Sequence, residues 1–375
     1  MKFQVNKDVL SDAVSFAVRI LPAKNTLQIL SGVLIEADAN ALLFTVYDFE
    51  VSAQAEVVAK VEDSGRVLVS ARLLSEIISN LPNAPVEIST DGNKLAISCG
   101  KANFKLPTMD ASQYPAPPEH PAVTGTISGE VLAEAVSQVA IAASREDVTP
   151  MLTGVMLEGN KDNLTLIATD RFRVAMADVA WKGANSEVAG LVPAKILQEV
   201  SKTFANQPEV TISLSADENR PMVAFKSNNR SVTTQLVKGN FPPVKTLFPS
   251  NVPDYAVITK QDLIESTRRV SKVLERDAAL RYTFTSDKVT LDATGNETGE
   301  GSDYVEIELT GKDIVVSLKP QFLIDGLAGI HSEFAKISFT NNENPHKPGP
   351  VLITSHGAKD NSDNFRYLLQ PNLLR

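Results

Sequence analysis

The chain has almost no sulfur chemistry available to it, because its 375 residues include a single cysteine, Cys99. One cysteine excludes an internal disulfide and a thiolate metal cage, and it suits a reducing compartment. Long apolar runs are also absent, and the N-terminal segment Met1–Val5 alternates like a strand instead of reading as a basic and then apolar signal. We therefore expect a cytoplasmic protein without a membrane segment, with Cys99 as a small buried strand residue.

Catalytic signatures are scarce as well. The four histidines have no metal-ligand spacing, and the sequence contains no Gly-x-x-x-x-Gly-Lys phosphate loop, dinucleotide fingerprint or Gly-x-Ser-x-Gly elbow. Asp170 with Arg171 or Arg173 resembles an acid/base pair, but no nucleophile stands near it in the sequence. We expect a protein that is not an enzyme and that needs neither a metal nor a cofactor.

An excess of positive charge is the third feature that the sequence lacks. The formal net charge is −9, and each third of the chain is mildly acidic. Proteins that simply coat nucleic acid are basic. Any surface that faces DNA must therefore come from an uneven placement of Lys and Arg.

What the sequence does contain is a repeat. The segments Leu152–Leu157 and Leu164–Asp170 fall without a gap on Leu30–Ile35 and Leu42–Asp48 when they are shifted by 122 residues. A chain of this length is expected to form about two to four domains. The repeat indicates that these domains share one design.

Each repeat is predicted to begin with a short strand, a polar cap and an amphipathic helix. Asn6, Ser128 and Thr259 are the expected N-caps, and Thr259 forms a plausible capping box with Asp262. Apolar residues recur at helical spacing after each cap, in Val9–Val18, Val131–Ala140 and Leu263–Leu274.

A second strand and helix are predicted later in each repeat, at residues 67–74, 190–197 and 315–322. Alternating strands separated by turns such as Asp91-Gly92 and Asn341-Asn342 lie between the helices, so the sheets should be largely antiparallel. Gly32 and Gly154 follow apolar segments and are interpreted as bulges or tight backbone contacts.

Proline-rich segments separate the repeats, at Tyr114–Pro121 and Phe241–Pro253. Proline fixes φ and resists both helix and central strand, so these segments are expected to be stiff connectors. The predicted domains are residues 1–122, 123–253 and 254–375.

Three features recur together in a known family: the three repeats in this order, the opening Met1-Lys2-Phe3, and the segments Ala168–Arg173 and Tyr367–Pro371. In these features the chain resembles the bacterial DNA sliding clamp, the β subunit of DNA polymerase III. The resemblance covers essentially the whole chain and is closest in character to clamps of high-GC Gram-positive bacteria. It implies an α+β fold of three tandem clamp repeats, each with two helices packed on antiparallel sheets. It also implies a head-to-tail dimer that closes into a ring.

The size of the repeats agrees with a ring of two chains. Six modules of this size would leave a hole about 35 Å wide, whereas three would leave about 5 Å, and a DNA duplex is about 20 Å across. The resemblance therefore implies a processivity factor that encircles duplex DNA, slides without sequence preference and tethers the replicative polymerase. Its further implied partners are the clamp loader, other DNA polymerases, ligase and mismatch-repair proteins.

These partners are implied to dock short linear motifs into a pocket between the second and third domains. This chain departs from the family at its C-terminal end. Gln370 and Asn372 stand where apolar residues are common, and Leu373 stands in the place of an arginine. These departures predict weaker anchoring of aliphatic side chains or a preference for a different peptide. In this interpretation Arg173 satisfies polar atoms at the rim of the pocket. Carried over position by position, the pocket consists of Leu152, Thr169, Arg171, Phe172, Arg173, Val174, Pro242, Thr246, Leu247, Pro350, Leu368, Gln370, Pro371 and Asn372.

In a clamp, basic residues on the helices and on the loops that end them are expected to touch DNA phosphates without reading bases. Arg268, Lys272 and Arg276 fall four residues apart and predict a basic stripe on one helix. Two alternatives stay open: each residue could simply belong to a solvated helix face, and Lys272 could lie near the subunit interface. Positions that match the family's DNA-facing residues are Lys24, Arg72, Lys195 and Lys202, and Arg145 and Arg268 are added by their location.

The subunit interface is implied to pair an edge strand near Phe104–Leu106 of one chain with one near Ser302–Val305 of the other. The residues assigned to it are Phe104, Leu106, Ile77, Ser302 and Tyr304. Two other classes of protein stay open at this point, a repeat-built enzyme and a scaffold or ligand-binding protein that does not encircle DNA.

Overall fold

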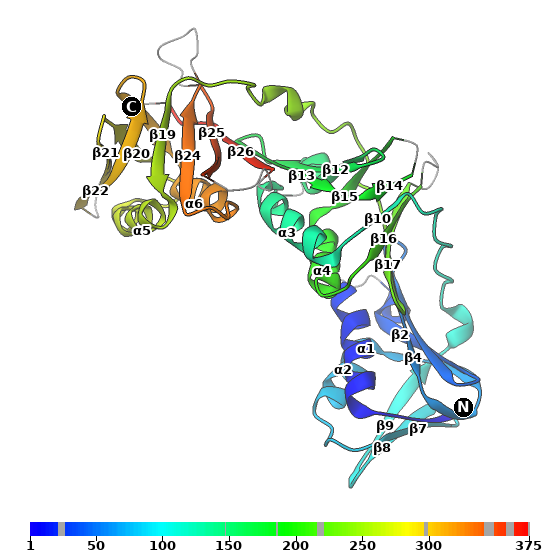
Figure 1. Ribbon diagram of the computed structural model, residues 1–375. Coiled ribbons are helices and arrows are strands. Elements are labelled where there is room, and N and C mark those ends of the chain that lie inside the picture. Colours follow the sequence, from blue (N-terminus) through cyan, green and yellow to red (C-terminus); the bar gives the residue numbers. More distant parts are fainter. Residues whose placement is uncertain are drawn as a thin grey trace. The chain divides into compact units, whose positions relative to one another are not determined.

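The chain forms two compact units, each with one continuous antiparallel sheet (Figure 1). Unit 1 consists of residues 1–130, 182–184 and 195–236, and unit 2 of residues 131–181, 185–194 and 237–375. The structure is a computed structural model, and it describes residues 1–21, 27–146, 148–184, 187–215, 221–295, 299–340, 349–357 and 364–373.

The sheet of unit 1 runs in the order β14-β10-β16-β17-β18-β4-β3-β2-β6-β9-β8-β7-β1-β5. Its strands are β1 (Lys2–Val5), β2 (Gly32–Asp38), β3 (Ala41–Tyr47), β4 (Val51–Val58), β5 (Lys60–Asp63), β6 (Gly65–Ser70), β7 (Val86–Asp91), β8 (Lys94–Cys99), β9 (Ala102–Met109), β10 (Gly125–Ile127), β14 (Lys182–Gly183), β16 (Val210–Leu214), β17 (Met222–Ser227) and β18 (Arg230–Gln235).

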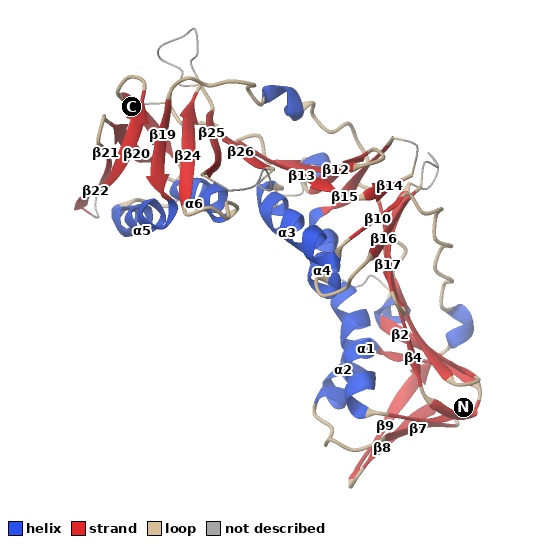
Figure 2. Cartoon of the chain, in the orientation of Figure 1, coloured by secondary structure: helices blue, strands red, loops and turns tan. Residues whose placement is uncertain are grey.

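The helices of unit 1 are α1 (Lys7–Ile20), α2 (Ala71–Ser79) and, from Lys195 on, α4 (Ala194–Phe204). Helix α1 begins as predicted, because the Asn6 side chain accepts a hydrogen bond from the Asp8 backbone N–H at 2.8 Å. Helices α1 and α2 lie side by side on one face of the sheet (Figure 2). The buried Phe16 of α1 packs against Phe204 of α4, with ring centroids 6.4 Å apart.

The sheet of unit 2 runs in the order β15-β11-β12-β13-β26-β25-β24-β19-β22-β21-β20-β23. Its strands are β11 (Gly154–Gly159), β12 (Asn163–Thr169), β13 (Arg173–Ala180), β15 (Val188–Pro193), β19 (Tyr255–Thr259), β20 (Leu280–Phe284), β21 (Lys288–Gly295), β22 (Gly299–Thr310), β23 (Ile314–Leu318), β24 (Phe334–Phe339), β25 (Val351–His356) and β26 (Phe365–Leu369).

The helices of unit 2 are α5 (Lys260–Val270), α6 (Pro320–Ala328) and, from Val131 on, α3 (Gly129–Val139). The capping box predicted for α5 is wrong. Thr259 is the N-cap residue, but its side chain makes no capping bond. The N–H of the next residue, Lys260, donates to the Glu333 carbonyl at 2.9 Å. Short 3₁₀ turns are η1 (Gln28–Ser31), η2 (Ala111–Gln113), η3 (Ala140–Ala142), η4 (Pro150–Leu152), η5 (Val244–Leu247) and η6 (Ser271–Val273).

The second strand and helix of each repeat form where the sequence predicts them, as β6 and α2, β15 and α4, and β23 and α6. Of the two interpretations of Gly32 and Gly154, a bulge or a tight contact, the structure supports the tight contact. A Cβ atom at Gly32 would lie 2.7 Å from Leu68, and one at Gly154 would lie 2.8 Å from Leu191. Both glycines therefore permit the close approach of a neighbouring strand.

Within each continuous sheet, strands of two successive repeats pair with each other. These pairs are β4 with β18 in unit 1 and β13 with β26 in unit 2. Every strand pair among the described residues is antiparallel, as predicted. Gly92 makes the predicted turn between β7 and β8 with a φ of 59°, whereas the Asn341-Asn342 turn falls outside the described residues.

Cys99 is a buried strand residue, and its Sγ donates to the Pro82 carbonyl at 3.3 Å. None of the described helices is both long and apolar enough to traverse a bilayer. Within the described ranges, no cluster of three or more His, Cys, Asp or Glu side chains is suited to hold a metal ion.

Candidate functional site

The tight turn that joins β12 to β13 is the centre of the predicted peptide pocket. Asp170 Oδ1 accepts hydrogen bonds from the N–H groups of Phe172 and Arg173, at 3.0 and 3.1 Å. The Thr169 hydroxyl donates to the Arg173 carbonyl at 2.7 Å. Arg171 adopts a left-handed conformation with a φ of 77°, which costs free energy for a residue with a Cβ atom. The two short polar side chains therefore hold the turn in a shape that the backbone alone disfavours.

Arg173 lies inside unit 2 and not at the rim, so the polar-rim role expected for it is wrong. Its side chain is 7% exposed, and each guanidinium nitrogen has a partner within the protein. Nε donates to Asp170 at 2.9 Å, and one terminal nitrogen donates to Asp325 at 2.6 Å and to the Tyr367 hydroxyl at 3.2 Å. The other terminal nitrogen donates to the Ile141 carbonyl at 2.7 Å.

The surroundings of Arg173 keep it charged. Burial by itself lowers the pKa of the guanidinium, but Tyr367, Asp325 and Asp170 together raise that pKa above its ordinary value. Burial raises the pKa of the Tyr367 hydroxyl, so this group stays protonated. The guanidinium also stacks over the Phe322 ring, 4.2 Å from its centroid. Arg173 thus ties the β12–β13 turn to helix α6 and strand β26.

An aliphatic cluster lies under the predicted pocket. The buried members are Ile167, Val174, Met176, Val244 and Leu368, and Met156, Phe241, Phe248 and Leu352 pack against them while partly buried. Leu247, in the same 3₁₀ turn as the buried Val244, leaves 57% of its surface exposed, and Phe172, two residues before Val174, leaves 55% exposed. Exposed apolar groups beside a well-packed apolar floor suit the anchor side chains of a bound peptide.

The remaining predicted pocket residues fall around the same place in unit 2. Leu152, Thr169 and Pro371 are buried, Pro242 and Pro350 are half-buried, and Thr246, Gln370 and Asn372 are exposed. The backbone N–H of Gln370 donates to the Phe172 carbonyl at 2.8 Å, and that of Asn372 donates to the Ser317 carbonyl at 2.8 Å. The C-terminal segment is therefore fastened beside the β12–β13 turn.

The corresponding place in unit 1 is filled by the protein itself. Tyr47, which stands where Thr169 stands in the next repeat, is buried with Leu34, Leu68 and Tyr114. The Tyr114 hydroxyl accepts a hydrogen bond from the Tyr47 N–H at 2.7 Å, and burial raises the pKa of Tyr114 to about 12. Two large rings close this junction, so we expect one peptide groove in each chain.

The predicted DNA-facing residues are exposed wherever the structure describes them. Arg72 and Lys195 lie in the first turns of α2 and α4, Lys202 lies near the end of α4, and Arg145 and Arg268 are also exposed. Lys24 lies outside the described residues. Lys202 is 3.0 Å from Glu199, an exposed pair that neutralises part of its charge.

The basic helical stripe predicted from Arg268, Lys272 and Arg276 is wrong. Helix α5 ends at Val270, Lys272 falls in the 3₁₀ turn η6, and Arg276 comes after that turn. The tighter pitch of a 3₁₀ turn breaks the four-residue register that places side chains on one face. Only Arg268 of the three belongs to α5.

Both predicted edge segments have one unpaired side among the described residues. Strand β9 pairs with β8 along Ala102–Pro107, and β6 reaches it only at Thr108 and Met109. Strand β22 pairs with β21 along Gly299–Glu306, and β19 reaches it only from Ile307 on. Each strand therefore has a free edge for a further strand.

The side chains predicted for the subunit interface divide into two groups. Phe104 is 40% exposed and Tyr304 is 62% exposed, and Ser302 is also exposed. Ile77 is half-buried on α2. Leu106 is 2% exposed because it packs into the core of its own unit, so only its backbone is available to a neighbouring chain.

Comparison with known proteins gives one consistent result. Family models for the N-terminal, central and C-terminal domains of the DNA polymerase III beta subunit match residues 1–118, 126–243 and 245–358. The beta sliding clamp of Streptomyces coelicolor is 40% identical over 376 residues and 99% of each chain. That of Micrococcus luteus is 42% identical over 300 residues, which is 79% of this chain and 96% of the relative.

Two further comparisons extend this result. The beta sliding clamp homolog GriR of Streptomyces muensis is 34% identical over 99% of each chain. The crystal structure of the Bacillus subtilis sliding clamp matches the fold with a TM-score of 0.91 at 24% identity, over the full length of both chains.

The three matched segments, the antiparallel sheets and the paired helices define a DNA clamp fold. This chain belongs to the bacterial DNA polymerase III beta subunits, the beta sliding clamps. It is therefore a non-catalytic processivity subunit that works with DNA and a DNA polymerase. The Streptomyces and Micrococcus relatives confirm the predicted similarity to clamps of high-GC Gram-positive bacteria. The alternative of a scaffold that does not act on DNA receives no support.

Proposed function

We propose that two copies of this chain close head to tail around duplex DNA, with β9 of one copy pairing along its free edge with β22 of the other. The observation that carries the proposal is the presence of two free strand edges, each bearing an exposed aromatic side chain. Six clamp domains, with boundaries near residues 122 and 253, would make up the ring. DNA is then retained because it passes through the ring and not because it is gripped.

The exposed cations of α2, α4 and α5 support sliding. Arg72, Lys195, Lys202 and Arg268, together with Lys24 and Arg145, would contact phosphates and leave the bases unread. Such contacts are equivalent at every position along the duplex. The ring would therefore move without sequence preference.

Retention that depends on topology should be lost when the DNA acquires ends. We expect protein that a clamp loader has placed on a nicked circular plasmid to stay with the DNA through gel filtration, and to leave almost completely after a single restriction cut. Linear DNA with both ends blocked by streptavidin should retain it again. Equal loss from the circular and the open linear DNA would rule out the ring.

The groove of unit 2 is proposed to dock peptides from the replicative polymerase, the clamp loader, other DNA polymerases, ligase and mismatch-repair proteins, in the cytoplasm. The aliphatic cluster would receive the apolar anchors, and Leu247 and Phe172 would cover them. Polar Gln370 and Asn372 line one wall, so the affinity should rest on few anchors.

Leu247→Ala is the direct test of this groove. We expect the affinity for a leucine-containing polymerase peptide to fall about 10- to 30-fold, because an exposed anchor-covering residue is lost. The free energy of unfolding should change by no more than about 0.5 kcal/mol, because the side chain is mostly exposed. Fluorescence anisotropy and thermal unfolding measure the two quantities.

Leu73→Ala provides the matched control, since Leu73 is an exposed leucine of α2 in unit 1. It should leave peptide affinity unchanged. If both variants bind the peptide as the parent does, the groove is misplaced.

A further inference from the structure

Strand β22 turns one face to solvent and the other towards the core of unit 2. From Ser302 to Glu308 the exposed side chains alternate with buried or half-buried ones, as expected for a strand that covers a core. Val305 and Ile307 are the buried apolar members of the inner face. Asp303 occupies the preceding position on that face, and its side chain is only 27% exposed. A carboxylate at a position that suits an apolar side chain costs free energy unless it is paired.

The Asp303 carboxylate ties β22 to helix α5. One oxygen accepts hydrogen bonds from Nε and a terminal nitrogen of Arg269, at 3.0 and 2.8 Å, and from the Ser266 hydroxyl at 2.9 Å. Ser266 is fully buried on α5. The other oxygen accepts from the Tyr304 N–H at 2.9 Å. Burial by itself raises the pKa of Asp303, but the bonds from Arg269 and Ser266 outweigh burial and lower that pKa. A charged carboxylate with these donors holds the strand in one alignment on the helix.

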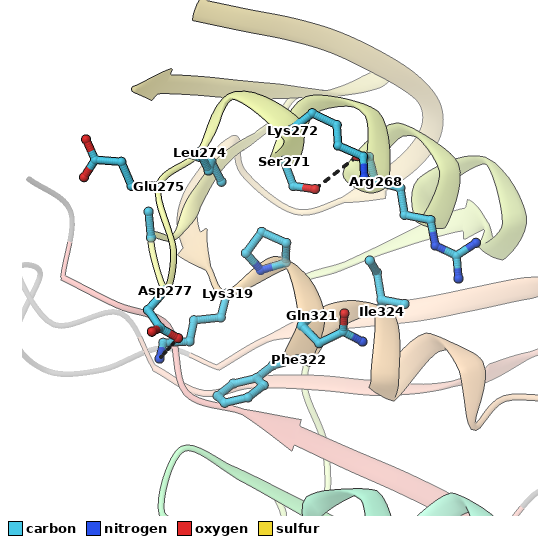
Figure 3. Close-up of a pocket in the computed structure, with 12 residues that line it drawn as sticks. Arg268, Ser271, Lys272, Leu274, Glu275, Asp277, Lys319, Gln321, Phe322 and Ile324 are labelled. Atoms are coloured by element: carbon cyan, nitrogen blue, oxygen red, sulfur yellow. Dashed lines mark hydrogen bonds and ion pairs between the residues drawn. The ribbon is translucent and has the colours of Figure 1, made fainter. Parts of the chain in front are cut away.

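The end of α5 that receives β22 is itself held in place. Arg268 and Arg269 are neighbours in the last turn of α5, but Arg269 reaches β22 whereas Arg268 lines a pocket beside the first turn of α6 (Figure 3). The Ser271 hydroxyl donates to the Arg268 carbonyl at 3.1 Å. Gly301 lets the inner face of β22 come close, because a Cβ atom there would lie 3.2 Å from Val273 of η6. A small residue and a polar tie therefore seat the strand at two successive inward positions.

We propose that Asp303 is the positioning residue for ring closure, and that through Ser266 and Arg269 it fixes the register in which β22 offers its free edge to β9 of the other chain. The inference rests on the proposed pairing of β9 with β22 and adds the residue that aligns it. A strand that slips by one residue turns every side chain to its other face. Tyr304 would then point inward and be lost from the pairing edge.

Correct alignment is a strict requirement for a ring of this kind. The two chains are proposed to join head to tail, and such contacts close into a ring only when the rotation between the chains is right. A displaced edge would leave the second interface unable to close, so the chains would separate or add further chains. A polar tie in a protein interior is often no more stabilising than packed apolar side chains, but it can select one register.

The test replaces the tie by apolar side chains in the full-length protein. A variant that combines Ser266→Ala, Arg269→Met and Asp303→Leu should unfold at about the temperature of the parent, because apolar side chains often replace such a pair without loss of stability. Each interface should nevertheless weaken about tenfold, which raises the dissociation constant of the dimer about a hundredfold. Sedimentation equilibrium measures that constant, and retention on nicked circular plasmid should fall with it. An unchanged dissociation constant would overturn the role of Asp303.

Single changes separate alignment through α5 from a direct contact with the other chain. Arg269→Met and Asp303→Asn should each weaken the dimer, and the two combined should weaken it no further, because both break the same tie. Arg269→Lys should restore part of the affinity, since it keeps the positive charge. Additive losses from the two changes would show two independent contacts with the other chain and would overturn the proposal.

Glu265→Gln is the matched control, since Glu265 approaches the same Arg269 guanidinium at 3.9 Å from within α5. It should leave the dissociation constant unchanged. A loss as large as that of Asp303→Asn would assign the effect to the charges around Arg269 and would refute a specific tie to β22. If the parent protein sediments as one chain at every concentration, the ring itself is refuted, and the role of Asp303 with it.

Discussion

Replacing Arg173 by alanine is expected to lower the free energy of unfolding by about 3–5 kcal/mol, the usual loss when one partner of a buried ion pair is removed. The variant leaves Asp170 and Asp325, whose side chains are 13% and 10% exposed, without their common cation. It also removes the ring contact with Phe322 and the donor to the Ile141 carbonyl. Urea unfolding followed by circular dichroism measures the loss.

Peptide binding should fall in the same variant, for a reason other than direct contact. The β12–β13 turn loses its tie to α6, so Phe172 and the wall beside it are no longer held in place. Hydrogen exchange should speed up along β13 and β26, which pair from Arg173 to Ala177.

Arg171→Ala is the matched control for Arg173→Ala. Arg171 is exposed, and its guanidinium donates to Thr149 at 2.8 Å. Its loss should cost no more than about 0.5 kcal/mol. A similarly small cost for Arg173→Ala would show that the buried network does not stabilise the junction. A double-mutant cycle with Asp325→Ala isolates the pair, since residues in direct contact do not add independently.

The burial of Arg173 was beyond the reach of sequence reasoning. Its partners Asp325 and Tyr367 are 152 and 194 residues away along the chain, and nothing local marks them as contacts. One signal was present in α6, where Asp325 stands between Leu323, Ile324 and Leu327 on an otherwise apolar face. A carboxylate in that position predicts a buried cation, but the sequence does not say which one.

Local patterns predicted the elements well and their ends less well. Apolar periodicity and the 122-residue shift located the helices and strands, because both follow from side-chain alternation within a few residues. The end of α5 at Val270 carries no proline or glycine signal, and the periodicity runs on to Leu274. The Thr259 side chain likewise makes no capping bond, although the sequence places Asp262 three residues after it.

The repeat also shows how one position takes two different roles. The sequence aligns Tyr47 with Thr169, yet the alignment alone treats both as the polar end of a strand. In the fold, Tyr47 is buried in an apolar cluster with Tyr114, whereas the buried Thr169 spends its hydroxyl on the Arg173 carbonyl and holds the β12–β13 turn. Side-chain identity at one repeated position therefore distinguishes a ring-filled junction from the predicted docking site.

The largest effect on function is expected from charges placed on the free edges. Phe104→Asp or Tyr304→Asp should each weaken every interface of a two-chain ring, because each interface contains one β9 edge and one β22 edge. A loss of about 2 kcal/mol at each of two interfaces raises the dimer dissociation constant about a thousandfold. Sedimentation equilibrium should then report the 40.4 kDa mass of one chain at concentrations where the parent is a dimer.

The same variants should lose retention on circular DNA while keeping their fold and their affinity for a leucine peptide. Both side chains are substantially exposed, so the change scarcely affects the core of either unit. Val148→Asp serves as the control, since Val148 is 84% exposed and lies in neither edge strand. A charge on the pairing edge cannot be buried in the interface without a partner. If the Tyr304→Asp variant still sediments as a dimer and stays on circular plasmid, the ring must therefore close through some other surface.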